Sequence, residues 1–292
     1  MLARSLRYAR PTSVAEAVGL LAEHPGARPL AGGQSIVNVL KLRAAEVDAL
    51  IDISRLQELR GVRATPDGGV EIGAGTRYVD LARDPLLLER NPLAAEVAGG
   101  LVDVQVRNRG TIGGNVCLND PTSNFPPLLV ALGGRIRVAS AGGGDREVPA
   151  EQFFVGPYRC ALAQGELVRA IVLPPLHDGE GAGYATLQLA RDSWALARGA
   201  AWVRRGADGT VEAARVVVAC IAPRPARQHA IEAALIGTRG EEPGLLAATA
   251  GALEGVDAIA DSHASAEYRM EMAREYARRA IRQALGQTEA AA

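Results

Sequence analysis

The sequence is poor in the residues that build metal and disulfide sites. It has three cysteines, Cys117, Cys160 and Cys220, which are far apart and odd in number. No C-x-x-C pair occurs, which argues against a zinc ribbon, an iron–sulfur cluster and a disulfide framework. The four histidines are scattered, with no metal-ligand spacing. We therefore expect no metal in this chain, and a reducing cytoplasm as its compartment.

Long apolar runs and an excess of charge of one sign are also missing. No apolar run approaches the ~20 residues that span a bilayer, so no membrane span is expected. The net charge is −1, which gives no general attraction to nucleic acid or acidic membranes. The opening stretch MLARSLRYARPTS has arginines but no apolar core behind them, so it is a poor signal peptide. A length of 292 residues, 48% of them hydrophobic, predicts two folded domains.

The familiar nucleotide and hydrolase motifs are absent. No G-x-G-x-x-G follows a strand, and GAG at 73–75 stops short of that pattern, so a Rossmann site is unsupported. There is no G-K-[ST], which argues against a nucleoside triphosphatase. There is no G-x-S-x-G elbow, which leaves a serine hydrolase unsupported.

Two glycine-rich segments stand out instead, AGGQS at 31–35 and NRGTIGGN at 108–115. Glycine turns where other residues clash, and it lets backbone N–H groups approach a ligand closely. Two such nests in one chain predict a bound anionic nucleotide, held mainly by main chain. The first segment alone is equally compatible with a structural turn, although Gln34 and Ser35 offer donors toward a phosphate. Ser35 is also a candidate cap for a helix that follows the turn.

Polar residues near the second segment extend the hypothesis. Asp120 is typical of a carboxylate that accepts from a ribose hydroxyl or an amide near a nucleotide, or it simply belongs to an Asp-Pro turn. Lys41 and Arg43, just past the first turn, are compatible with a solvated helix face. They are also compatible with positive charge near a diphosphate or with a partner surface.

Apolar periodicity and capping signals predict a mixture of helices and strands. Ser13 and Glu16 form a capping-box pattern, and Ser265 and Gly286 delimit a long helix. On that helix Tyr268, Met272 and Tyr276 share one face, which favours a place in the core. Strands are expected at 28–31, 48–54, 69–73, 134–140, 166–173, 184–204 and 211–221, and helices at 14–24, 92–101, 125–132, 226–236, 243–254 and 264–285. Pro174-Pro175 and the glycine-rich stretch 179–183 are the best candidate for an interdomain linker.

Taken together, five segments make the pattern specific. They are PLAGGQSIVNVLKLR at 29–43, LIDIS at 50–54, IGAGT at 72–76, VRNRGTIGGNVCLNDPTSNFPPLLVALGG at 106–134 and ASAEYRMEMAREYARRAI at 264–281. In this order they closely resemble the medium, FAD-binding subunit of molybdenum hydroxylases. That family includes the medium subunits of carbon monoxide dehydrogenase and of bacterial xanthine, nicotine and quinoline dehydrogenases.

The resemblance implies an α+β fold. A p-cresol-methylhydroxylase-type FAD-binding domain would cover residues 1–176, with α/β subdomains at about 1–55 and 56–176. A C-terminal domain of the carbon monoxide dehydrogenase flavoprotein type, with antiparallel strands and a helical bundle, would cover 177–292. The implied cofactor contacts are Ala31, Gly32, Gly33, Gln34, Ser35 and Ile36 on one side of the FAD diphosphate, Thr111, Ile112, Gly113, Gly114 and Asn115 on the other, and Asp120 nearby.

The resemblance also implies a role in a complex. A large subunit would carry the molybdenum cofactor and a small subunit two [2Fe–2S] clusters, in a dimer of heterotrimers. This chain would be the subunit that binds the flavin and passes electrons to an external acceptor, with no catalytic acid or base of its own. Two alternatives stay open, a flavin-free scaffold subunit and a stand-alone flavin oxidase. Two departures bear on the site: Asn124 stands where many relatives have an acid, and Gln188 where many have a lysine before an arginine at 191.

Overall fold

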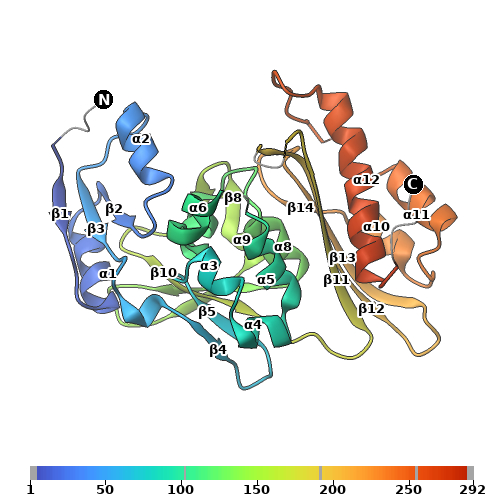
Figure 1. Cartoon of the computed structure of the whole chain (residues 1–292), viewed down its shortest axis with the longest axis horizontal. Helices are drawn as coiled ribbons and strands as arrows, with labels where there is room; N and C mark the ends of the chain where they lie inside the picture. Colours follow the sequence, from blue (N-terminus) through green and yellow to red (C-terminus); the bar gives the residue numbers. More distant parts are fainter. Residues whose placement is uncertain (1–4, 102, 191–192, 254–255, 288–292) are drawn as a thin grey trace.

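The computed structural model describes residues 5–101, 103–190, 193–253 and 256–287. Figure 1 shows three successive units along the long axis of the molecule, with the N-terminal unit in blue and the C-terminal unit in orange and red. Within the described residues, no helix combines the length and apolar character needed to cross a membrane.

The N-terminal unit is a small parallel sheet with a helix packed on it. Its elements are β1 (Arg7–Ala9), α1 (Val14–Glu23), β2 (Ala27–Leu30), α2 (Ile36–Leu42) and β3 (Ala49–Asp52). The strand order is β1-β3-β2, and Leu30 pairs with Asp52 at the carboxyl ends of β2 and β3. The predicted capping pattern is confirmed, because the Ser13 hydroxyl accepts from the Glu16 amide at 3.1 Å.

The middle unit is an antiparallel sheet covered by short helices. Its strands run in the order β4-β5-β10-β6-β7, and β8 and β9 form a separate two-stranded ribbon. The elements are η1 (Gln57–Leu59), β4 (Val62–Ala64), β5 (Val70–Gly73), α3 (Tyr78–Leu81), α4 (Pro85–Arg90), α5 (Pro92–Gly99), α6 (Val104–Arg109), α7 (Ile112–Leu118), α8 (Phe125–Ala131), β6 (Arg135–Ala139), β7 (Arg146–Pro149), α9 (Ala150–Phe153), β8 (Phe154–Gly156), β9 (Arg159–Cys160) and β10 (Leu167–Leu173). The apolar β10 lies at the centre because its side chains are buried on both faces.

The C-terminal unit is a four-stranded antiparallel sheet backed by helices. Its elements are β11 (Glu180–Gln188), β12 (Ala195–Arg205), β13 (Val211–Ala219), β14 (Ala226–Arg227), α10 (His229–Leu235), α11 (Glu242–Ala250) and α12 (Ala266–Ala284). Figure 1 shows this sheet between α8 on one side and α10, α11 and α12 on the other. All seven residues of α8 are buried, since it packs against β12 and β13 of the C-terminal sheet and against α7 and α9 of the middle unit.

The predicted glycine linker at 179–183 is wrong, because most of it belongs to β11. A Cβ atom at Gly181 would lie 2.0 Å from the Ala284 carbonyl oxygen, and one at Gly183 would lie 2.0 Å from that of Ala280. These glycines are therefore needed where helix α12 crosses the strand closely, and they do not mark a flexible connection.

Helix α12 begins and ends where the sequence predicts. The Ser265 hydroxyl accepts from the Tyr268 amide at 3.2 Å, and Gly286 has the left-handed φ of 69°. Its core face consists mainly of alanines. Met272 and Tyr276 pack at the edge of that core, but Tyr268 is 46% exposed, so its expected core position is wrong.

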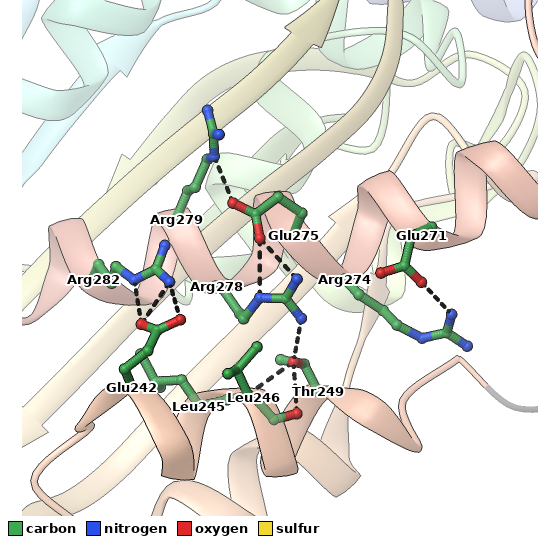
Figure 2. Close-up of polar contacts among 10 residues, drawn as sticks. All are labelled: Glu242, Leu245, Leu246, Thr249, Glu271, Arg274, Glu275, Arg278, Arg279 and Arg282. Carbon is green, nitrogen blue, oxygen red and sulfur yellow. Dashed lines mark hydrogen bonds and ion pairs between the residues drawn. The ribbon is translucent and has the colours of Figure 1, made fainter. Parts of the chain in front are cut away.

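Arginines on α12 tie it to α11, as Figure 2 shows. The Arg278 guanidinium donates to Glu275 and, at 2.8 Å, to the Thr249 hydroxyl on α11. Arg282 pairs with Glu242 at the start of α11. Because α11 has only two buried residues, these polar contacts contribute to holding it against α12. The predicted helix 243–254 ends at Ala250, and residue 254 lies outside the described residues.

Candidate functional site

The two glycine segments, at 31–35 and 108–115, meet in the structure. The first follows β2, and the second joins α6 to α7. A Cβ atom at Gly32 would lie 2.1 Å from the Arg109 carbonyl oxygen and 2.9 Å from the Gly110 Cα atom. Glycine at position 32 is therefore required by the contact between the two segments.

A cleft of about 350 Å³ opens beside this contact. Its lining is Leu30, Ala31, Gly32, Gly33, Gln34, Val37, Asn38, Lys41, Asp52, Ser54 and Arg109. Lys41 borders the cleft, which favours the alternative of positive charge near a diphosphate over a solvated helix face. Arg43 lines a different cleft with Glu46 and Asp48. No carboxylate of the described residues pairs with Lys41 or Arg109.

The first turn is an open nest of backbone donors. Gly33 has a φ of 76°, which turns the chain sharply after Gly32. Among the residues that the structure covers, the amides of 32–35 make no hydrogen bond within the protein. The expected cap by Ser35 is wrong, because its side chain makes no capping bond to α2. Three of these four residues, Gly32, Gly33 and Gln34, line the cleft together with Lys41, and unsatisfied amides beside a lysine are suited to an anion.

The second segment is the start of a helix and not an open nest. The Thr111 hydroxyl caps α7 by accepting from the Gly114 amide at 3.1 Å. The amide of Ile112 donates to Thr76 and that of Gly113 to Ala74, at 3.1 and 2.8 Å. These donors are already satisfied, so the prediction of a second row of free amides is wrong.

The two glycines of α7 have different surroundings. A Cβ atom at Gly113 would lie 2.6 Å from the Ala74 Cβ atom, so this residue is needed for packing beneath the helix. At Gly114 the nearest atom would be the Thr111 hydroxyl at 3.0 Å, and no other lies within 4 Å. Gly114 therefore leaves part of the surface of α7 without a side chain.

Asp120 lies in a loop that folds back on itself. It is 8% exposed, and its Oδ1 atom accepts from the Thr122 amide at 2.8 Å and the Thr122 hydroxyl at 2.6 Å. Its Oδ2 atom accepts from the Tyr158 hydroxyl at 3.0 Å. Burial first, and the Asp120 charge second, raise the pKa of Tyr158. These bonds are those of the Asp-Pro turn that the sequence left as an alternative.

Asn124 links this loop to α7 and α5. Its Oδ1 atom accepts from Asn115 Nδ2 at 3.3 Å, and its own Nδ2 donates to the Val97 carbonyl oxygen at 3.3 Å. An ionised aspartate at this position could not donate to the Val97 carbonyl oxygen. The asparagine that departs from the family pattern therefore makes a hydrogen bond that the acid could not make. The Asn115 Oδ1 atom is buried and has no partner among the described residues.

Two residues of the C-terminal sheet hold the same loop, and the sequence analysis missed both. Arg198 of β12, 6% exposed, donates to the Thr122 carbonyl oxygen at 2.7 Å. Tyr184 of β11 donates to the Asn124 carbonyl oxygen at 2.8 Å. An arginine inside the apolar run ALARGAA was the signal for a buried polar contact. Gln188 donates to Ser193 in its own hairpin, and residue 191 lies outside the described part.

The cysteines are not all separate in space. Cys117 of α7 and Cys160 of β9 lie together at the edge of the middle core. Hydrogen bonding between the two thiols, and then burial, raise the pKa of Cys117. The chain distance of 43 residues between them concealed this contact.

Comparison with known proteins identifies the family. Residues 4–176 match the FAD binding domain in molybdopterin dehydrogenase, and residues 182–284 match the CO dehydrogenase flavoprotein C-terminal domain. The chain belongs to the FAD-binding family of molybdopterin dehydrogenases.

Relatives in this family cover nearly the whole chain. The carbon monoxide dehydrogenase medium chain of Hydrogenophaga pseudoflava is 36% identical over 96% of this chain and 97% of its own length. The glyceraldehyde dehydrogenase medium chain of Sulfolobus acidocaldarius is 37% identical over 80% of this chain and 81% of its own. The solved structure of carbon monoxide dehydrogenase from Hydrogenophaga pseudoflava matches with a TM-score of 0.93 and 37% identity, over 98% of this chain and 99% of that one.

These findings confirm the predicted family, the α+β fold and the assignment as an FAD-containing oxidoreductase subunit. The structure fits the cofactor of this family. In the open nest at 32–35, Gly32, Gly33 and Gln34 line the cleft that Lys41 borders, and their free backbone donors suit the diphosphate of FAD. Which residues touch FAD stays a prediction.

Proposed function

We propose that this chain carries FAD between an iron–sulfur subunit and an external electron acceptor in a heterotrimeric molybdenum hydroxylase. Its partners would be a large subunit with the molybdenum cofactor and a small subunit with two [2Fe–2S] clusters, assembled as a dimer of heterotrimers. The chain resembles medium chains of dehydrogenases over most of its length, which supports this role. Thiols at Cys117 and Cys160 fit a reducing cytoplasm as the compartment.

The observation that carries the proposal is the open nest after β2. Its four amides would hold the diphosphate, flanked by Ala31 and Ile36, because backbone N–H groups bind phosphate without needing charged side chains. Thr111 to Asn115 would form the facing wall. In that wall Gly114 leaves room for the ligand, and Thr111 and Asn115 contribute side chains.

The Asp120 loop would border the flavin half of the cofactor. It is held from the C-terminal sheet by Arg198 and Tyr184, so its shape depends on both domains. We take 1–176, with subdomains at about 1–55 and 56–176, as the FAD-binding domain and 177–292 as the C-terminal domain. In this arrangement the C-terminal sheet completes the site.

FAD supplies the electron-carrier chemistry when it is bound, since a flavin can exchange electrons singly or in pairs. The residues of this chain bind and orient it and keep the diphosphate in place. No described residue is required to act as a general acid or base.

Co-expression with the two partner subunits tests the proposal. The purified complex is expected to contain three different chains and one FAD per copy of this chain, measured from the flavin absorption band after denaturation. A complex that contains molybdenum and iron–sulfur clusters but no flavin on this chain supports a scaffold subunit and overturns the proposal. Purification of this chain alone, with flavin and with substrate oxidation of its own, points to a stand-alone oxidase and overturns it equally.

A further inference from the structure

Asp52 places a carboxylate at the edge of the cleft. It is the last residue of β3, and it pairs with Leu30, the last residue of the neighbouring parallel strand β2. The nest begins two residues after Leu30, so the carboxylate and the free amides lie at the same carboxyl edge of one sheet. Ligands of parallel sheets bind at this edge. Figure 1 shows β3 between β1 and β2 in the N-terminal unit, below α2.

The orientation of the Asp52 side chain is maintained by two donors. Tyr8 of β1 donates its hydroxyl to Oδ2 at 2.5 Å, and the Ser54 amide donates to Oδ1 at 2.9 Å. Each carboxylate oxygen can accept a further hydrogen bond, since an ionised carboxylate has about four lone-pair positions. The group is thus fixed in direction and still able to bind a donor from a ligand in the cleft.

The carboxylate stays ionised at neutral pH. Burial is the largest influence and raises the pKa of Asp52, but the bonds from Tyr8 and Ser54 and the charge of Arg10 outweigh it. The pKa of Asp52 therefore lies below its ordinary value. A negative charge at this place repels a phosphate group, so the diphosphate belongs at the amides and a neutral hydrogen-bond donor belongs at Asp52.

FAD offers hydroxyl donors on both sides of its diphosphate, the ribose of adenosine and the ribityl chain of the flavin. The ribityl side leads to the isoalloxazine ring, a large aromatic surface that needs apolar neighbours. Exposed aromatic side chains lie near both places, at Tyr8 beside Asp52 and at Tyr158 beside Asp120. The proposed function puts the flavin half at the Asp120 loop, which does not line this cleft. The adenosine side is therefore the one that faces Asp52.

We propose that Asp52, oriented by Tyr8, accepts hydrogen bonds from the ribose hydroxyls of the adenosine half of FAD. The inference rests on the proposed function and adds a direction to it. The dinucleotide runs from Asp52 across the nest to the Asp120 loop, and the flavin ring lies at the far end.

The test is a binding comparison on the complex after removal of its flavin. Wild type, Asp52→Ala, Asp52→Asn and Tyr8→Phe are titrated with FAD, ADP, 2′,3′-dideoxy-ADP and FMN by calorimetry. Glu23→Ala is the matched control, because it removes one exposed acidic charge at the end of α1, away from the cleft.

A bond between a hydroxyl and a charged carboxylate implies a loss of about 10-fold to 100-fold on its removal. Asp52→Ala is expected to lose this factor for FAD and for ADP alike, and to bind FMN as wild type does. Wild type is expected to prefer ADP over the dideoxy analogue by a similar factor, and Asp52→Ala to show no such preference. Tyr8→Phe is expected to lose less than Asp52→Ala, since it only loosens the carboxylate.

Several results overturn the inference. Unchanged or tighter ADP binding in Asp52→Ala shows that the carboxylate only repels the diphosphate. An equal loss for FMN shows that the ribityl chain faces Asp52. Retained FMN binding reports that a variant is folded, and Asp52→Asn keeps the shape of the side chain if the alanine variant does not fold. Wild-type complex that binds no FAD contradicts the proposed function itself, so the two failures are distinct.

Discussion

Replacing Gly32 with alanine tests whether the two glycine segments must touch. The added Cβ atom would lie 2.1 Å from the Arg109 carbonyl oxygen, whereas ordinary contacts begin at about 3.4 Å. The segments must therefore separate by about 1.3 Å, the difference between these two distances. The atoms in the way are backbone and cannot rotate aside. Overpacking of this kind costs about 1–3 kcal/mol, which corresponds to about a 5-fold to 150-fold change in an equilibrium constant.

We expect most of this cost to appear in FAD affinity, because the nest lies at one side of the contact and α6 at the other. The assay is FAD titration of the flavin-free complex, together with urea denaturation of the same samples. Gly19→Ala is the control: no atom lies within 4 Å of its added Cβ, and it lies inside helix α1, so it should be stabilising by about 0.5–1 kcal/mol. A Gly32→Ala variant with wild-type FAD affinity and wild-type stability would refute the contact and the site built on it.

Three further predictions concern other residues of the chain. Gly114→Val should abolish FAD binding and leave the circular dichroism spectrum unchanged. Gly113→Ala should instead lower the stability of the chain, because only Gly113 packs against Ala74, the residue that follows β5; equal effects of the two substitutions would contradict this division. Gly183→Ala should destabilise the chain by about 1–3 kcal/mol in denaturant titration, since its Cβ would lie 2.0 Å from a carbonyl oxygen of α12; unaltered stability would show that α12 can shift. The amide of His263, and then Arg269, lower the pKa of Asp261 to about 2, so its ionised form contributes stability that is present above about pH 4 and is lost as the pH falls toward 2. Asp261→Asn should therefore unfold at a lower temperature than wild type at pH 7, with a gap that narrows below pH 4, and a gap independent of pH would argue against the ion pair.

Local signals in the sequence predict the longer elements, although the strand expected at 184–204 is in fact two paired strands, β11 and β12. Short elements such as β4, α3 and α7 were not expected. The caps at Ser13 and Ser265 are found where expected, because a hydroxyl one residue before a helix can satisfy an amide of its first turn without distant partners. The same pattern fails at Ser35, whose side chain makes no capping bond. The strand at β10 is found because a continuous apolar run flanked by turn residues indicates a buried strand. The family resemblance is carried by five short segments, and comparison confirms it over nearly the whole chain.

The errors arise where a residue serves a distant neighbour. The glycines at 181 and 183 suggest a linker when only the sequence is considered. In the structure they allow α12, about 100 residues later in the chain, to pack closely against β11. Gly113 reads as part of a nest, but it packs on Ala74. Asp52 was not singled out, since an aspartate at the end of a strand is common, and only the pairing with Leu30 brings it to the cleft.

Composition, caps and the two glycine segments were therefore enough to predict an anionic nucleotide bound by a chain of mixed helices and strands, because these features depend on a few consecutive residues. The identity of the nucleotide as FAD came from the family resemblance, which is carried by the order of five short segments. The folded arrangement alone revealed that one glycine segment is an open nest and the other a capped helix, since both read as glycine turns until their hydrogen-bond partners are known. It also brought Asp52 to the edge of the cleft and Arg198, from a separate sheet, to the loop that contains Asp120. Such contacts depend on packing between residues far apart in the chain, and no local pattern encodes them.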